Sequence, residues 1–358
     1  MIRVLLVHAG IIPHYRVPIY TYLSDYLKRY GFDLTVTSDG IQQGTPDPIN
    51  FQYVKMRLSV SSIAKLISRQ QTDIIIDYME LKHWYLFPTY LIAKGIMGRK
   101  MIYWGQGLDL LDADAKLKNL AYVVEQSLCD AIILYAECLK KYVPARLHKK
   151  VFFANNTLYL NYKGLPPGVT REKILSDYGI KTKKNIICMG RMQKRKRVDH
   201  LFDAFVLMNR PDAGLIFVGP DPEGVLTNIN GGNIFKLGPI YGDKRFDLLS
   251  AADVYCLPGA VGLSIIDAFY CGLPFVTEDG DVSAEIVYLK DAVNGFIVPR
   301  DDIAALSEKL RFLLDNDETR QKFSKAAKKE ITENASIEKM CAGFRDALFY
   351  ATGQTASL

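Results

Sequence analysis

The sequence predicts an α/β protein of two domains, each built around a parallel sheet with helices on both faces. The chain has 358 residues, which is more than one ordinary hydrophobic core accommodates. Short apolar runs alternate with helix-like stretches along the chain, a pattern typical of strand–helix units and parallel sheets. A segment rich in proline and glycine interrupts this alternation near the middle. We therefore expect two similar halves joined by a linker.

The first half contains six predicted strands, most of them bounded by Gly, Asp or Lys. The start, MIRVLLVHAGIIPHYR, has a short apolar core and no cleavage pattern, so we expect a strand there rather than a signal peptide. The longest apolar stretch, 84–93, is well below the ~18 residues that a membrane span needs. The predicted strands are 3–8, 33–37, 73–78, 100–105, 130–135 and 150–155, with helices at 17–30, 60–69, 83–97 and 115–128.

Residues 156–174 contain the run Gly-Leu-Pro-Pro-Gly and show no clear period, as a linker would. We place the two domains at 1–165 and 166–336. The tail from 301 to 350 is helical throughout, and its last helix, within 337–358, either caps the second domain or packs back on the first. The predicted strands of the second half are 185–190, 213–219, 233–238, 252–258, 274–277 and 295–298.

Composition and spacing argue against several classes of protein. A net charge of +6 without a clustered basic patch is too small to indicate a nucleic-acid partner. The six cysteines are scattered, which favours reduced thiols in a reducing compartment. The five histidines form no pair with zinc-ligand spacing. A dinucleotide-dependent dehydrogenase is disfavoured because HAGIIPHY, after the first strand, lacks the G-x-G-x-x-G pattern.

The stretch PGAVGLSIIDAFYCGLPFVTEDGD, residues 258–281, follows a predicted strand and leads into a short helix. Glycines let backbone N–H groups approach a ligand, and a helix start offers unpaired donors. We interpret Gly262, Leu263 and Ser264 as an anion cradle, with Asp267 about one turn further in and suited to a ribose diol. The alternative is a glycine-rich turn in which Asp267 is a solvated helix residue.

The stretch GRMQKRKRVDHLFDAF, residues 190–205, supports the first of these readings. Gly190 ends a strand, and the spacing of Arg191 and Lys196 lets both side chains reach one point at the sheet edge. A guanidinium and an ammonium are the usual pair for a diphosphate. A basic run is often a solvated surface, but a second anion site at the same edge favours the diphosphate.

The order of these motifs resembles the retaining glycosyltransferases of family 4, which have the GT-B fold. GR-x(4)-K is followed by G-L-S-x-x-D-A-x-x-x-G-x-P and then by AEIVYLKDAVNGFIVPRDD at 284–302. The resemblance covers most of residues 185–315. The first half is similar in layout and in its PHYRVPIYTYL opening. The resemblance implies two Rossmann-like, doubly wound parallel-sheet domains facing across a cleft, with the nucleotide in the second and the acceptor in the first.

The family pattern also assigns roles to individual residues. Arg191 and Lys196 would contact the donor diphosphate, the 262–264 segment would cradle phosphate, and Asp267 would hold the ribose. Because these cations can replace Mg²⁺ at the leaving group, we predict no metal ion and no cofactor. The full set of expected site residues is Arg191, Lys196 and Gln106 for catalysis, and Gly10, Gly190, Gly219, Ile240, Gly262, Leu263, Ser264, Asp267 and Glu278 for the donor.

Two positions depart from the family pattern. Gly259 stands where the family has a glutamate that contacts the donor sugar, and Asp267 shortens the second glutamate. Gln106 stands where a histidine commonly ends a first-domain strand, and an amide hydrogen-bonds but does not titrate. We expect Gly259 to vacate space beside the sugar, for a bulkier substituent or for Glu278 or Asp279, and therefore predict a modified-sugar donor.

The sequence thus predicts a retaining, metal-independent hexosyltransferase that uses a nucleotide diphosphate sugar. We expect a glycan or lipid-linked glycan acceptor in cell-surface polysaccharide biosynthesis. We also expect a cytoplasmic location, peripheral at the inner face of the membrane, where the basic stretch 137–150 would meet an anionic surface. The alternative is that this stretch is a solvated helix end and turn. The alternatives are a GT-B protein that binds nucleotide sugar without transfer and a GT-B nucleotide-sugar epimerase.

Overall fold

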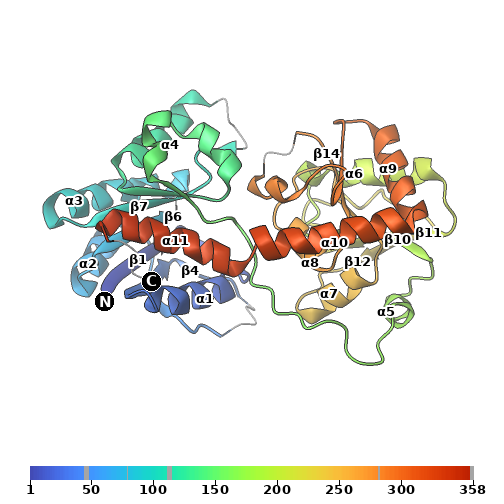
Figure 1. Ribbon diagram of the computed structural model, residues 1–358, viewed down its shortest axis with the longest axis horizontal. Coiled ribbons are helices and arrows are strands. Elements are labelled where there is room, and N and C mark those ends of the chain that lie inside the picture. The colour runs from blue at the N-terminus through green and yellow to red at the C-terminus, as the bar shows by residue number, and fades with distance from the viewer. Residues whose placement is uncertain (44–47, 79, 111–114, 281–282, 355–358) are drawn as a thin grey trace. The chain divides into compact units, whose positions relative to one another are not determined.

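The computed structural model describes residues 1–358 except 44–47, 79, 111–114, 281–282 and 355–358. The chain forms two compact units (Figure 1). The first contains Met1–Tyr159 and the residues from Ser336 on, and the second contains Leu160–Ala335. The chain therefore passes between the units near 160 and again near 335, whereas the sequence placed the first boundary at 165.

The first unit is built on a seven-stranded parallel sheet in the order β5-β3-β1-β6-β7-β8-β9. Its order reverses beside β1, because successive strands are added first on one side of β1 and then on the other. The strands are β1 (Ile2–His8), β3 (Phe32–Ser38), β5 (Gln52–Lys55), β6 (Ile74–Tyr78), β7 (Lys100–Gly105), β8 (Ala131–Leu134) and β9 (Val151–Phe153), with a two-stranded sheet of β2 (Ile11–Ile12) and β4 (Gly40–Ile41) beside them.

Helices cover both faces of this sheet. The last helix, α11 (Ile337–Thr352), packs on β7, β8 and β9 and beside α1 (Figure 1). Gly343 permits this contact, since a Cβ there would lie 2.0 Å from the carbonyl oxygen of Phe153. The other helices are α1 (Arg16–Lys28), α2 (Val60–Gln70), α3 (Phe87–Met97) and α4 (Lys116–Leu128), with 3₁₀ turns η1 (Leu81–Leu86), η3 (Glu137–Tyr142) and η4 (Ala145–Lys150).

The second unit has a six-stranded parallel sheet in the order β12-β11-β10-β13-β14-β15. Its strands are β10 (Lys184–Met189), β11 (Ala213–Val218), β12 (Ile234–Leu237), β13 (Val254–Cys256), β14 (Phe275–Glu278) and β15 (Gly295–Val298). Its helices are α5 (Arg171–Asp177), α6 (Val198–Met208), α7 (Asp243–Ser250), α8 (Ser264–Tyr270), α9 (Ile303–Asp315) and α10 (Asp317–Asn334), with 3₁₀ turns η5 (Lys194–Lys196) and η6 (Ala284–Tyr288).

The predicted fold class is confirmed, because both sheets are parallel and carry helices between successive strands. Several predicted segments differ locally; the helix expected at 83–97, for example, is a 3₁₀ turn up to Leu86 and an α-helix from Phe87. The strand expected at 252–258 ends at Cys256, and the linker expected at 156–174 is already helical from Arg171. The Thr170 side chain starts α5 by accepting a hydrogen bond from the N–H of Lys173. Within the described part of the chain, no helix combines the length and apolarity needed to cross a bilayer.

Candidate functional site

At the carboxyl edge of the second sheet, two glycines let the chain segments that follow β10 and β11 approach each other closely. Gly190 follows β10 and Gly219 follows β11, with φ of +133° and +135°. A Cβ on Gly219 would lie 2.0 Å from the carbonyl oxygen of Gly190, so a side chain there is sterically blocked. The sequence assigned both glycines to the donor, and the structure gives both a backbone reason to be glycine.

The turn η5 and the loop after β13 are joined by their backbones. The N–H of Gly259 donates to the Lys196 carbonyl (3.0 Å), and the N–H of Ala260 donates to that of Arg195 (3.0 Å). A Cβ on Gly259 would lie 2.1 Å from the Arg195 carbonyl oxygen. The expectation that Gly259 vacates space beside the donor sugar is therefore wrong, because the backbone of the basic turn fills that space.

The side chain of Lys196 continues this junction. Lys196 is 8% exposed, and its Nζ donates to the carbonyl oxygens of Ala260 (2.6 Å) and Val261 (3.3 Å). Ser264 Oγ also donates to Val261 (2.7 Å), which ties the start of α8 to the same loop. Gly262 adopts a left-handed φ of +57° between them. The structure thus unites the two sequence motifs, with the Lys196 ammonium against the glycine-rich loop.

Asp267 is half-buried on α8 and faces a cation. Its side chain is 17% exposed, and its carboxylate lies 3.3 Å from Arg245 Nη2. Burial raises the pKa of Asp267 to about 6, and the guanidinium of Arg245 limits that rise. The alternative of a solvated helix residue does not describe this environment. Arg245 starts no recognisable motif, so the sequence did not reveal the pair.

The remaining predicted donor residues differ in accessibility. Arg191 is exposed, whereas Leu263 and Ile240 are half-buried. The Glu278 side chain is fully buried at the end of β14 and is bound by Arg197 and His200. The structure therefore does not bring Glu278 to an accessible surface where a sugar could contact it.

A group of ligand atoms on His200, Glu278 and Asp301 lies within 4.8 Å, the geometry of a candidate metal site. However, Arg197 Nη1 contacts the carboxylates of both Glu278 and Asp301 (3.1 Å to the latter). The guanidinium already supplies the cation that these acids need. We therefore interpret the cluster as an ion-pair network.

Asp-x-Asp sequences, a common form of metal-binding site, occur at 112–114, 279–281 and 315–317. The sequence at 112–114 lies outside the described residues, and so does Asp281, the last residue of the second sequence. In the third, Asp315 pairs with Arg210, and Asp317 pairs with Arg320 (2.5 Å) and Lys184 (3.1 Å). The prediction of metal independence therefore rests on Arg191 and Lys196 alone.

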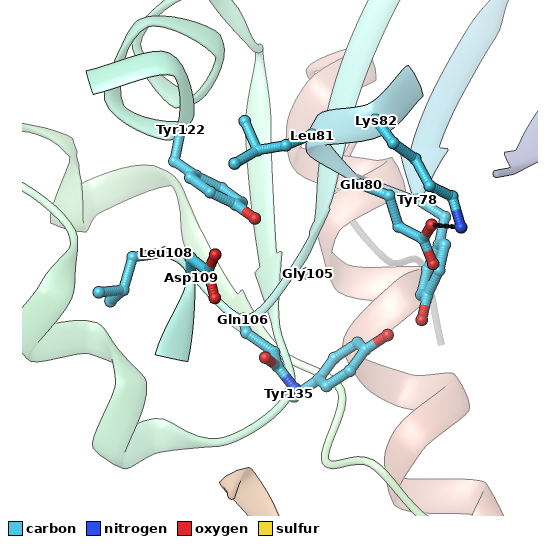
Figure 2. Close-up of a pocket in the computed structure, with 10 residues that line it drawn as sticks. All are labelled: Tyr78, Glu80, Leu81, Lys82, Gly105, Gln106, Leu108, Asp109, Tyr122 and Tyr135. Atoms are coloured by element: carbon cyan, nitrogen blue, oxygen red, sulfur yellow. Dashed lines mark ion pairs between the residues drawn. The ribbon is translucent and has the colours of Figure 1, made fainter. Parts of the chain in front are cut away.

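The first unit has its own cavity, of about 530 Å³, at the carboxyl ends of β6, β7 and β8 (Figure 2). Gln106, one of the predicted catalytic residues, is part of its lining. Figure 2 shows Tyr122 and Asp109 toward one side and the ion pair of Glu80 with Lys82 (2.6 Å) toward the other. The lining residues are Tyr78, Glu80, Leu81, Lys82, Gly105, Gln106, Leu108, Asp109, Tyr122 and Tyr135.

Gly10 lies close to this cavity rather than in its lining. A Cβ on Gly10 would lie 3.7 Å from Lys82 Nζ and 3.8 Å from the His83 ring, and its φ is +79°. Gly10 thus permits a left-handed turn after β1 beside one of the cavity residues.

A buried arginine that the sequence analysis missed supports the aromatic wall of the cavity. Arg16 is 1% exposed, and its Nη2 donates to Asn156 Oδ1 (3.0 Å) and the Tyr135 hydroxyl (3.4 Å). Its guanidinium carbon lies 5.0 Å from the centre of the Trp104 ring and 5.9 Å from that of Tyr78. The sequence did contain a signal for this residue, since the arginine in PHYRVP places a charge within an otherwise apolar helix start.

The second unit is similar in sequence to known proteins. Residues 170–330 match the family model described as glycosyl transferases group 1. A phosphatidyl-myo-inositol mannosyltransferase of Mycobacterium leprae is 31% identical over 158 residues, which are 41% of this chain and 42% of that protein. The sulfoquinovosyl transferase SQD2 of Arabidopsis thaliana is 28% identical over 151 residues, 40% of this chain and 29% of its own length. The match thus spans less than half of either relative.

The fold similarity extends over nearly the whole chain. The crystal structure of Anabaena HepE in complex with UDP-glucose has a TM-score of 0.77 and 15% identity, covering 97% of this chain and 99% of that one. At this identity the likeness concerns the fold. The second unit thus matches the glycosyl transferases group 1 family, and the fold of the whole chain is similar to that of HepE.

Proposed function

We propose that the chain transfers a sugar, with retention at the anomeric carbon, from a nucleoside diphosphate donor to a glycan acceptor. The observation that carries this proposal is the backbone junction between the Lys196 turn and the loop from Gly259 to Ser264. It brings an ammonium group and a glycine-rich loop together at the sheet edge where ligands of parallel α/β sheets bind. Arg191, which follows Gly190 at the end of β10, is exposed. The bound UDP-glucose of the structurally similar HepE supports a donor of this class.

The chemistry needs positive charge at the leaving group. As the bond between the sugar carbon and the phosphate oxygen breaks, negative charge grows on the diphosphate. Arg191 and Lys196 stabilise this charge electrostatically, because their cations are in place before the reaction begins. Asp267 accepts hydrogen bonds from the ribose hydroxyls. In this mechanism no metal ion is required.

The acceptor binds in the cavity of the first unit. Tyrosine faces pack against the apolar face of a sugar ring, while Gln106, Asp109 and Glu80 hydrogen-bond to its hydroxyls. A volume of about 530 Å³ lies within the usual range for small-molecule sites. We propose a cell-surface or lipid-linked glycan as acceptor and a cytoplasmic enzyme that works at the membrane surface.

We propose a modified sugar as donor for a reason that differs from the sequence expectation. Gly259 opens no space, but it also supplies no carboxylate to the donor sugar. A site without that acceptor does not penalise a donor lacking the matching hydroxyl. The missing carboxylate at position 259 also favours a second candidate function, nucleotide-sugar binding without transfer.

A panel of UDP-, GDP- and other nucleotide sugars separates the two candidates. Thermal unfolding reports binding, because a ligand at 100 times its Kd adds ~2.7 kcal/mol of stability. Release of nucleotide and a new glycan product report transfer. Turnover of any donor supports the transferase. Tight binding with no turnover on any acceptor supports the binding protein, and absence of all binding contradicts both.

A further inference from the structure

Glu278 ends β14 beside the candidate donor site, yet it contacts the protein and not the surface. Its carboxylate is bound by Arg197 on one oxygen and by His200 Nδ1 on the other (2.6 Å). The N–H of Asp301 also donates to it (3.2 Å). A guanidinium, an imidazole nitrogen and a backbone N–H therefore satisfy the hydrogen-bonding needs of this fully buried carboxylate.

Arg197 has an unusual backbone conformation directly after Lys196. Its φ of +51° and ψ of +45° lie in the left-handed region, which residues with a Cβ adopt at a cost. The N–H of Arg197 donates to the Lys194 carbonyl (3.0 Å), which closes the turn. The ion pair with Glu278 offsets this cost, and it fixes the direction in which the turn leads into α6.

The same end of β14 also holds the loop after β13, whose backbone pairs with the turn that carries Lys196. The N–H of Glu278 donates to the Pro258 carbonyl (3.2 Å), and Thr277 Oγ1 donates to that of Leu257 (2.7 Å). Residues 257–258 lead into Gly259, whose backbone pairs with Lys196. The end of β14 therefore anchors both the turn that carries Lys196 and the loop whose carbonyl oxygens the Lys196 ammonium contacts.

We propose that Glu278 is a positioning residue for the donor diphosphate, which holds the Lys196 turn in place through Arg197 without touching the ligand. This inference rests on the proposed function, since it assumes that Lys196 meets a diphosphate. It replaces the direct donor contact that the sequence predicted for Glu278. A role limited to folding stability would instead leave the site's preference for phosphate unchanged.

The test compares the affinity for a nucleoside diphosphate with that for the corresponding nucleoside. UDP and uridine are the first probes, followed by GDP and guanosine, with calorimetry on the intact chain. Glu278→Gln keeps the shape but removes the charge. Arg197→Gly removes the same ion pair from the other side and suits the left-handed backbone, so it folds even where the first variant does not.

Asp253→Asn is the matched control. Asp253 is also a buried carboxylate held by an arginine, Arg171 (2.6 Å), but it lies before β13 at the opposite sheet edge. The Asp253→Asn variant should have a lower melting temperature but an unchanged ratio of diphosphate affinity to nucleoside affinity. A circular dichroism spectrum of each variant confirms that the fold is retained.

We expect Glu278→Gln and Arg197→Gly each to weaken diphosphate binding by about tenfold or more, as loss of an ordered charged contact does. Nucleoside affinity should stay within about twofold, and the double variant should be no weaker than the worse single one. An unchanged affinity ratio in both variants overturns the inference. A wild-type protein that binds no diphosphate more tightly than its nucleoside overturns the proposed function itself.

Discussion

Two residues at the edge of the second sheet depend on each other although they share no chemistry. Gly259 has no side chain, and this absence lets the basic turn approach close enough for Lys196 to reach the carbonyl groups beyond it. Both residues are visible in the sequence as parts of separate motifs. Their contact was not predictable, because it depends on two backbone segments lying side by side although they are 63 residues apart in the sequence.

Removing either cation of the site should slow transfer. Arg191→Ala and Lys196→Ala should each cost roughly 2–4 kcal/mol of transition-state stabilisation, the usual effect of losing one charge-stabilising donor. Steady-state kinetics with the identified donor measure this as a fall in kcat/KM. Lys194→Ala, a neighbouring exposed lysine in the same turn, is the control. Full activity of either variant with an intact fold would contradict the diphosphate assignment.

A single methyl group at position 259 should separate the two backbones. Gly259→Ala places a Cβ 2.1 Å from the Arg195 carbonyl oxygen, so the turn carrying Lys196 has to move. We expect weaker diphosphate binding and lower stability by ~1–3 kcal/mol, as for other overpacked sites. Gly232→Ala is the matched control, because a Cβ there meets nothing within 4 Å and its φ is not positive. Equal affinities for the two variants would refute this account.

Nucleotide affinity should depend on pH through Asp267. Burial raises its pKa to about 6, so the carboxylate is ionised at pH 8 and becomes protonated as the pH falls through about 6. A ribose diol binds best to the ionised form, so affinity should be full above that pH and decline below it. Calorimetry from pH 5 to 8 measures the step, which Asp267→Asn should abolish together with part of the affinity.

Among the elements, strands buried on both faces were the most predictable. Val4 to Val7 of β1 and all six residues of β11 are buried, and their apolar runs matched the observed strands to within a residue. β5 was missed because its sequence, QYVK, is half-exposed at the sheet edge and carries little apolar signal. The candidate site was predictable as motifs, whereas the Arg245 and Arg197 pairs required the fold.

One helix of the first unit shows a row of apolar side chains on its exposed face. Along α4, Leu117 is 87% exposed, and Leu120, Val124 and Leu128 continue the row at helical spacing. The basic stretch 137–150 attaches to the end of this helix, since Lys150 Nζ donates to the Ser127 carbonyl (3.1 Å). Apolar and basic groups therefore adjoin, the combination that favours an anionic lipid surface.

We expect the chain to sediment with anionic vesicles at low salt and to be released at high salt. Leu117→Ser with Leu120→Ser should weaken this binding, because the apolar contribution of α4 is lost. Val206→Ser with Leu207→Ser changes two equally apolar exposed residues of α6 in the second unit, and serves as control. A wild-type protein that stays in solution at low salt would rule out the membrane proposal.

At the scale of the whole molecule, catalysis should not depend on a metal ion. In the proposed mechanism Arg191 and Lys196 supply the charge at the leaving group, so transfer should survive EDTA. The measurement is the initial rate with and without chelator, and with Mg²⁺ or Mn²⁺ added back. Strict metal dependence would contradict the charge assignment and direct attention to Asp279, the first acid of the Asp-x-Asp sequence that follows β14.

The position of α11 has a consequence for how the chain folds during synthesis. The second unit is continuous, so all of it has been translated by Ala335. The first unit, although it begins the chain, stays incomplete until α11 can cover β7, β8 and β9. N-terminal domains generally fold first on the ribosome, but here β7, β8 and β9 lack the helix that covers them until α11 has been translated. The apolar side chains of these three strands therefore stay open to solvent on that face while the whole second unit is being made.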